Sequence, residues 1–270
     1  MDKRTDIHFP ANEFEKIFIK SIWRLSEFDV NKKVETILPK GTVELIFNFS
    51  DQIDYVNPAL QISRKLPSVF INGLNFNPFK LLKTGCQDFL GVQLNAPGLK
   101  LLFNISANEF NDRVYEGSIF CPCLDSLSNE LFGKQTFNEQ VEAILKWVRK
   151  KVSFVNYGYS IDRVQRLMCL NFFRELTVKK ISDEICLSER QLRRFSTEWL
   201  GMSTEEFILY NKYLISLQLL HDSKWTLTEI GLKAGYYDQS HFIREFKSYT
   251  ELTPKEYRKI FTDFPGHIFV

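Results

Sequence analysis

The residues best suited to chemistry in this sequence are two groups of cationic and polar side chains near the C-terminus. The first group has three arginines and a threonine: Arg190, Arg193, Arg194 and Thr197. The second mixes an amide, a hydroxyl, an apolar group and two cations: Gln239, Ser240, Ile243, Arg244 and Lys247. In the DNA major groove, arginine pairs with guanine, glutamine pairs with adenine, and an apolar group touches the thymine methyl. These residue types therefore predict recognition of base edges, with Arg193 and Lys247 better suited to phosphate contacts.

The alternative interpretation is that each group forms only a solvated face of a helix, which is common for charged residues. An internal repeat argues against it, because the two groups lie in segments that match each other at an offset of fifty residues. A helix cap, an apolar anchor, an arginine, an aromatic residue, and a second cap with its acid recur in that order. The matched positions are Ser188, Leu192, Arg194, Trp199, Ser203, Glu206 and Phe207 in the first segment, and Asp238, Phe242, Arg244, Tyr249, Thr253, Glu256 and Tyr257 in the second. Such a repeat indicates one supersecondary unit used twice, and the unit has the form helix, tight turn, helix.

The elements that position these groups are helices with clear start signals. Apolar residues spaced for one helix face should point inward, namely Leu192, Phe195 and Trp199 in the first segment and Phe242, Phe246 and Tyr249 in the second. Capping boxes are predicted at Ser188 with Gln191, Ser203 with Glu206, Thr226 with Glu229, and Thr253 with Glu256. Pro254 suits the first helical turn. The predicted helix-turn-helix units cover about residues 177–200 and 227–250.

The first half of the chain has the composition of a β-rich domain. Apolar, β-branched and aromatic runs predict strands at 42–49, 68–71 and 89–94, with turns at 72–73 and 97–98. An amphipathic helix is expected over 138–151, and an interdomain linker over 153–160. We therefore predict an α+β protein with two domains. Residues 1–155 form a cupin-like or related β-rich domain with C-terminal helices, and residues 156–262 form an all-α domain with two helix-turn-helix units.

The segment from 227 to 259 resembles the second helix-turn-helix of AraC/XylS-type transcription regulators. The resemblance rests on Ala-Gly-Tyr at 234–236, Asp-Gln-Ser-His-Phe at 238–242, Arg-Glu-Phe-Lys at 244–247 and the run from Thr253 to Arg258. The segment ISDEICLSERQLRRFSTEWLGMSTEEF resembles the first unit of the same family less closely. It has Ser196 where the family usually has an aromatic residue and Thr204 where proline is common. We expect helix rotation to bury Phe195 instead of Ser196.

The resemblance implies a one-component, sequence-specific transcription regulator. Its two recognition helices would enter adjacent major-groove turns of double-stranded DNA, and because the helices differ, one molecule should read an asymmetric site. The nine residues named first are the expected DNA contacts. Further partners that the resemblance implies are a second copy of the chain in a homodimer and RNA polymerase if the protein is an activator. The sequence leaves open the operator, the direction of regulation and the oligomeric state.

The segments 38–51 and 89–98 look like the β-rich domain that precedes these units in one AraC-type subgroup, which implies ligand sensing, dimerisation, or both. A small-molecule effector is therefore expected, with its identity and site unknown. Phe47, Phe49, Phe70 and Phe89 are candidates for pocket or core. No metal or other cofactor is expected, because His8 is the sole histidine of this half. Cys121-Pro122-Cys123 could suggest a soft-metal or redox site, but it lacks further ligands nearby and is interpreted as two partly buried cysteines at a helix start.

Two other functions remain open at this stage. Some DNA-repair alkyltransferases fuse an AraC-like domain to a cysteine acceptor domain, but Cys86 lies near an acid rather than among cations. The N-terminal domain could instead bind a protein partner. No nucleophile lies in a catalytic arrangement with His221 or His241, so we expect no enzyme. The five cysteines lack disulfide spacing, and no apolar run approaches the roughly 18 residues of a membrane span. A cytoplasmic chain that crosses no membrane is therefore expected.

Overall fold

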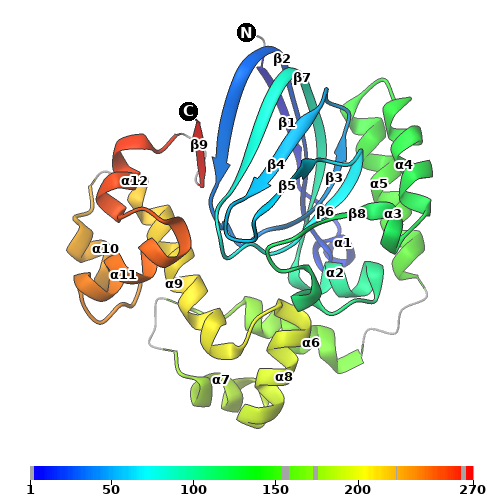
Figure 1. Cartoon of the computed structure of the whole chain (residues 1–270). Coiled ribbons are helices and arrows are strands. Elements are labelled where there is room, and N and C mark those ends of the chain that lie inside the picture. Colours follow the sequence, from blue (N-terminus) through cyan, green and yellow to red (C-terminus); the bar gives the residue numbers. More distant parts are fainter. Residues whose placement is uncertain (1–2, 154–157, 173–175, 223, 263–265, 270) are drawn as a thin grey trace.

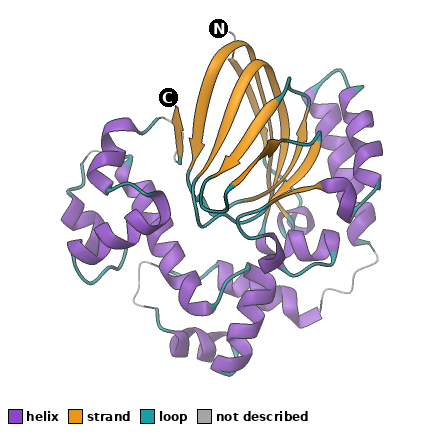
Figure 2. Ribbon diagram, viewed as in Figure 1, coloured by secondary structure: helices purple, strands orange, loops and turns teal. Residues whose placement is uncertain are grey.

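The structure, a computed structural model, describes residues 3–153, 158–172, 176–222, 224–262 and 266–269. A curved antiparallel sheet occupies the N-terminal half, and helices make up almost all of the C-terminal half (Figure 1; Figure 2). This arrangement confirms the predicted α+β class, with a β-rich part followed by a helical part. A short strand follows the last helix, but it lies beyond the range 156–262 that was predicted to be all-α.

The described residues form a nine-stranded sheet built around two long strands. Strand order runs β1, β2, β7, β3, β6, β8, while β4 pairs with β5 and β7, and β9 pairs with β2. The strands are β1 (Lys3–His8), β2 (Ile19–Ile37), β3 (Val43–Asn48), β4 (Ile53–Asn57), β5 (Ile62–Lys65), β6 (Val69–Asn72), β7 (Phe79–Leu94), β8 (Val114–Glu116) and β9 (His267–Phe269). The predicted strands correspond to β3, β6 and the second half of β7.

Both faces of this sheet are apolar. Successive side chains of a strand point to opposite sides, so neighbouring residues of one strand belong to different faces. In β3, Leu45 and Phe47 pack into a core shared with the helices of the N-terminal half. Ile46, between them, belongs to a separate cluster with Phe70 and Phe89. One face of the sheet therefore packs against helices, and the side chains of the other face line the concave side of the sheet.

The helices of the N-terminal half cover one face of the sheet (Figure 1). They are α1 (Glu13–Lys16), α2 (Ala96–Phe103), the 3-10 helix η1 (Ala107–Phe110), α3 (Gly117–Phe120), α4 (Cys123–Phe132) and α5 (Phe137–Val152). The amphipathic helix expected over 138–151 is confirmed as α5, which begins with a capping box of Thr136 and Glu139. The turn expected at 97–98 is wrong, since proline suits a first helical turn and α2 begins there.

The C-terminal helices are α6 (Gly158–Met168), α7 (Val178–Ile185), α8 (Glu189–Leu200), α9 (Thr204–Leu220), α10 (Leu227–Lys233), α11 (Gln239–Thr250) and α12 (Pro254–Ile260). All four predicted capping boxes are present, at the starts of α8, α9, α10 and α12. Part of the linker expected over 153–160 lies outside the described residues, and its last three residues belong to α6. Two helix-turn-helix pairs, α7 with α8 and α10 with α11, lie at the two ends of α9 (Figure 1).

Helix α9 also connects the C-terminal helices to the loops below the sheet through hydrogen bonds. The buried hydroxyl of Tyr210 accepts a hydrogen bond from the Gly41 amide at 3.0 Å and donates one to the Asn75 carbonyl at 2.8 Å. The hydroxyl of Tyr213 donates to the Pro39 carbonyl at 2.8 Å. Burial raises the pKa of both tyrosines, so they stay protonated and remain donors.

Candidate DNA interface and ligand cavity

Helix α8 presents the first predicted group on its exposed side. The Ser188 hydroxyl accepts from the Gln191 amide at 3.3 Å, which fixes the helix start. Leu192 and Trp199 are buried and hold the helix against the core. Exposed side chains point to the other side, namely Arg190, Arg193 and Arg194, while Thr197 is half-buried.

The arginines of α8 differ in what they contact. Both Nε and Nη2 of Arg193 donate to one oxygen of Glu205, at 2.8 and 2.7 Å. This partner raises the pKa of Arg193 and lowers the pKa of Glu205. Within the described residues, Arg190 and Arg194 form no ion pair. A phosphate contact by Arg193 therefore requires exchange of one anionic partner for another.

The expected rotation of α8 toward Phe195 is wrong. Ser196 is fully buried, whereas Phe195 is half-buried and stacks on Trp199, with ring centroids 5.8 Å apart. The Ser196 hydroxyl lies 3.1 Å from the hydroxyl of Thr204, which is also fully buried. Ser196 and Thr204 both depart from the family pattern, and their hydroxyls form a hydrogen bond with each other. Both buried groups therefore have a partner without a rotation of α8.

Helix α11 presents the second predicted group. The Asp238 carboxylate accepts from the His241 amide at 2.7 Å, and Phe242 and Phe246 are fully buried. The opposite side carries exposed polar and cationic residues, namely Gln239, Ser240, Arg244 and Lys247, with Ile243 half-buried beside them.

A shallow surface hollow lies along this side of α11. Its lining residues are Ser240, Ile243, Arg244, Lys247 and Ser248. Ser248 was not predicted from the sequence, although it lies one helical turn after Arg244 and so shares its face. Gln239 stands apart from the hollow and accepts a hydrogen bond from Thr228 of α10 at 2.9 Å. The structure therefore gathers four of the five predicted residues of this helix in one place.

The two histidines of this domain have structural contacts. His221 caps the end of α9, and its Nε2 lies 2.7 Å from the Tyr257 hydroxyl. His241 Nε2 lies 3.9 Å from Glu245, one turn further along α11. Neither contact involves a serine or a cysteine.

A second site lies inside the concave side of the sheet. The cavity has a volume of about 280 Å³, near the lower end of the range of roughly 300–1,000 Å³ for small-molecule pockets. Its wall is mainly apolar and aromatic, with contributions from Trp23, Ile46, Phe70, Phe79, Leu81, Phe89, Val114 and Phe269. Of the four aromatic candidates, Phe70 and Phe89 line this cavity, whereas Phe47 and Phe49 pack toward the helices.

The charged groups of the cavity wall pair with one another. Glu35 forms a buried ion pair with Lys83 and also lies 2.6 Å from Nδ1 of His267. Burial alone would raise the pKa of Glu35, but the hydrogen bond with His267 and the charge of Lys83 outweigh it and hold that pKa well below its usual value. Lys40 lies 3.1 Å from Nε2 of the same histidine.

These two contacts assign one neutral tautomer to His267. A lysine ammonium can only donate and a carboxylate can only accept, so Nδ1 carries the proton and Nε2 accepts from Lys40. Burial, reinforced by the charge of Lys40, lowers the pKa of His267 despite its hydrogen bond with Glu35. The histidine is therefore neutral at pH 7, and this cluster adds no free charge to the cavity.

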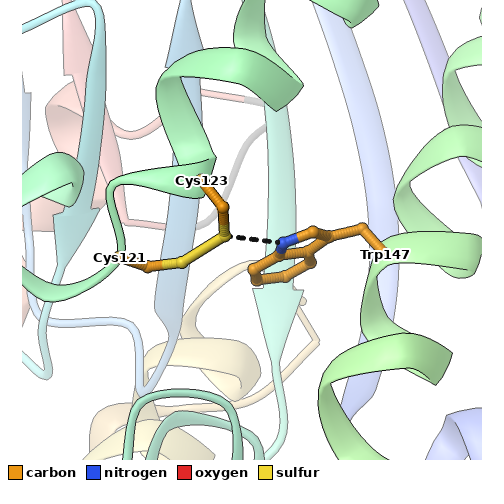
Figure 3. The surroundings of a disulfide bond; sticks show 3 residues. All are labelled: Cys121, Cys123 and Trp147. Atoms are coloured by element: carbon orange, nitrogen blue, oxygen red, sulfur yellow. Dashed lines mark hydrogen bonds between the residues drawn. A yellow bond between two sulfur atoms is a disulfide. The ribbon is translucent and has the colours of Figure 1, made fainter.

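The remaining candidate groups lie elsewhere. Cys121 and Cys123 form a disulfide, and Trp147 Nε1 donates to the Cys123 sulfur at 3.4 Å (Figure 3). The expectation of two unbonded cysteines is therefore wrong, although Cys123 does begin helix α4. Cys86 is exposed, and its amide donates to the Asp51 carboxylate at 2.7 Å. In the described ranges, no group of three or more His, Cys, Asp or Glu residues could hold a metal ion. Of the helices described, none has both the length and the apolar character to cross a bilayer.

Comparisons with known proteins give matches to two separate parts of the chain. Residues 181–260 match a helix-turn-helix domain family, and residues 8–116 match a domain of unknown function, DUF6597. The HTH-type transcriptional regulator ArgR of Pseudomonas aeruginosa is 28% identical over 92 residues, which are 34% of this chain and 28% of that protein. The uncharacterized HTH-type transcriptional regulator YtdP of Bacillus subtilis is 22% identical over 241 residues, which are 89% of this chain and 30% of that protein. The matches thus span less than a third of the length of these two relatives.

One solved structure that the comparison matches to this chain is that of ToxT from Vibrio cholerae. It has a TM-score of 0.48 and 15% sequence identity, and the match covers 96% of this chain and 98% of that chain. The helix-turn-helix match, the resemblance quoted above and the observed pairs α7–α8 and α10–α11 all fall on the same residues. Residues 181–260 therefore form a helix-turn-helix domain that is similar to the one in AraC/XylS-type regulators.

Proposed function

We propose that the protein is a one-component transcription regulator that binds a specific duplex DNA site. Helices α8 and α11 read the DNA, and the β-rich domain receives a small-molecule effector. The domain boundaries are those expected from the sequence, 1–155 and 156–262. The cytoplasm is the expected compartment for such a regulator. The relatives that carry this helix-turn-helix type are named as transcriptional regulators, which supports the proposal.

The observation that carries this proposal is the exposed face of α11. It combines two cations that form no ion pair among the described residues, Arg244 and Lys247, with Ser240 and the half-buried Ile243 around one hollow. Solvation alone does not require a half-buried isoleucine beside two cations. A major groove offers each of these groups a partner, namely guanine, phosphate, a base edge and a thymine methyl.

Helix α8 has the second DNA-facing surface, with different chemistry. Arg190 and Arg194 are the candidates for base contacts, and Arg193 and Thr197 for the backbone. Because the faces of α8 and α11 differ, one molecule should read two unlike blocks in adjacent major-groove turns, about 34 Å apart. A homodimer would double this site, and an activator would also contact RNA polymerase.

No residue is proposed as catalytic. The alkyltransferase alternative needs an activated acceptor cysteine, which requires a cationic or metal-bound environment. Cys86 has the Asp51 carboxylate beside its amide instead. No observation favours this alternative over the regulator.

The test is selection of bound sequences from random duplex DNA by the full-length protein. The wild type should enrich a site with two unlike blocks about one helical turn apart. The double variant Arg194→Ala, Arg244→Ala should lose that enrichment. A matched control is the double variant Lys146→Ala, Lys150→Ala, which removes two exposed cations from α5 and should keep it.

Three results bear on the assignment. Loss of enrichment in both double variants would mean that bulk charge, rather than the two helices, drives binding. Enrichment by the α8–α11 variant equal to that of the wild type would refute the assignment of these helices. Enrichment of a single block, lost on Arg244→Ala alone, would restrict base reading to α11.

A further inference from the structure

The short strand β9 belongs to two parts of the molecule at once. It pairs with β2 at the edge of the N-terminal sheet, with Ile37 opposite His267 and Glu35 opposite Phe269 (Figure 1). His267 and Phe269 line the cavity. Ile268, between them, points the other way and is buried in the hydrophobic cluster of the C-terminal helices. The cavity wall therefore includes a segment that follows the helix-turn-helix units in the chain.

Contacts on both sides hold β9 in place. The Leu38 amide, just after β2, donates to the Gly266 carbonyl at 2.8 Å. From the other side, the Gly266 amide donates to the Tyr257 hydroxyl of α12 at 3.3 Å, and that hydroxyl lies 2.7 Å from His221 at the end of α9. Any displacement of β9 thus disturbs contacts with the helices that flank the second unit.

Side chains from the sheet fix the two cavity-facing residues. The ammonium of Lys33 lies 4.4 Å from the centre of the Phe269 ring, a cation–π arrangement. Glu35 and Lys40 hold the two ring nitrogens of His267. Both side chains therefore form a defined part of the wall.

The chemistry of the wall indicates the class of ligand. Besides the Glu35–Lys83 pair, the Glu44 carboxylate accepts from Trp23 Nε1 at 3.1 Å and from Gln93 Nε2 at 3.2 Å. Glu27 is paired with Lys33 at 3.0 Å. The carboxylates of the wall thus already have partners, and most of the remaining surface is aliphatic and aromatic, with Thr5, Ser21, Asn72 and Gln93 as its uncharged polar residues. A charged ligand would have to break a buried pair, which is costly, whereas an apolar ligand would not.

We propose that β9 is one wall of the effector site and that the effector is an uncharged, mainly apolar small molecule in contact with Phe269. This inference rests on the proposed function only in taking the β-rich domain as the effector domain. In the docked state, β9 is paired with β2. A ligand that contacts β9 binds this state more tightly than a state in which the pairing is broken. By thermodynamic linkage, it then stabilises docking of β9 by the same factor. Occupancy of the cavity is in this way communicated to α12 and α9.

The test uses the neutral fluorescent probe N-phenyl-1-naphthylamine and full-length protein without DNA. The wild type should bind the probe with one saturable site. Leu81→Trp, which fills the cavity from β7, should abolish binding, and Val114→Phe serves as a second filling variant if Leu81→Trp fails to fold. Phe269→Ala, which removes an aromatic wall from the site, should weaken binding about tenfold. Ile260→Ala, on an exposed side of α12 and outside the cavity, should bind as the wild type does.

A second readout follows β9 directly. Amide hydrogen exchange of residues 267–269 should slow when the probe binds, and should not change when the probe is added to a cavity-filling variant. Wild-type affinity in Phe269→Ala, or unchanged exchange of β9 in the presence of the probe, would overturn the inference. Full probe binding by both filling variants would overturn it too, because the probe would then lie elsewhere. Selection of DNA sequences needs no probe, so the proposed DNA-binding function and this inference can fail independently.

Discussion

The hydrogen bond between Ser196 and Thr204 permits a quantitative test of how the first unit is held together. Both hydroxyls are fully buried and 3.1 Å apart, one at the end of α8 and one in the first turn of α9. Ser196→Ala leaves the Thr204 hydroxyl buried without its partner. We expect a loss in the free energy of unfolding of about 1–3 kcal/mol, the cost of an unsatisfied buried polar group.

The complementary change should cost less. After Thr204→Val, the Ser196 hydroxyl can turn to a backbone carbonyl one turn earlier in α8, an option that serine has within helices. The double variant Ser196→Ala, Thr204→Val removes both hydroxyls and keeps nearly the same shape. Its cost should therefore be smaller than that of Ser196→Ala alone, with a coupling energy of about 1–2 kcal/mol between the two sites.

The assay is urea unfolding of the four proteins of the cycle, followed by far-UV circular dichroism. Ser248→Ala, which removes an exposed hydroxyl from α11, should change stability by less than about 0.5 kcal/mol and is the control. Costs of the two single variants that simply add in the double variant would refute the reasoning. Thr204→Pro extends the test. Proline suits the first helical turn, yet it should destabilise this chain unless Ser196→Ala accompanies it.

The remaining predictions concern DNA binding and strand β9. Lys247→Ala should weaken binding to all duplexes alike and reduce the salt slope by about 1, whereas Arg244→Ala should relax base preference at one position; fluorescence anisotropy over a salt series separates them. Glu205→Gln frees Arg193 and removes a negative charge near the proposed phosphates, so the same assay should show binding about two- to fivefold tighter at low salt, and weaker binding would contradict the role of Arg193. Folding lowers the pKa of His267 from 6.5, and the charged groups around this histidine are Glu35, Lys40, Glu44 and Lys83. The contribution of neutral His267 to the pairing of β9 with β2 should therefore be present above pH 6.5 and lost as the pH falls below that value. Hydrogen exchange of β9 between pH 7.5 and 5.5 measures this loss, and a His267→Gln variant with the same pH dependence would contradict it.

The sequence predicts the helical half well because its signals are local. A cap and a Glu or Gln three residues later determine where α8, α9, α10 and α12 begin, and those pairs are the same in the sequence prediction and in the structure. The alternation of buried anchors such as Leu192 and Phe242 with exposed Arg194 and Arg244 follows from helical periodicity. The exposed cations of α8 and α11 were therefore predictable, whereas the burial of Ser196 and the place of Ser248 were not.

The sheet and the cavity depend on contacts that no local pattern reports. Strand β2 carries many polar residues, and bulges interrupt its pairing with β7, so it lacks a regular alternation. Strand β9 has only three residues, and its partner lies more than two hundred residues earlier. The hydrogen bond between Ser196 and Thr204 is likewise predictable only when it is known which helices are in contact. Register and pairing across the chain decide such features, and a single sequence does not encode them in its periodicity.

The position of β9 has a consequence for the order of assembly. His267 meets Glu35 across a separation of 232 residues, so the ribosome makes both helix-turn-helix units before it makes this edge of the sheet. Contacts between distant residues form slowly, because the intervening chain must be ordered first. A nascent chain that extends only to α12 can therefore hold both domains while its cavity still lacks one side. The cavity would then be completed only after both helix-turn-helix units have been made.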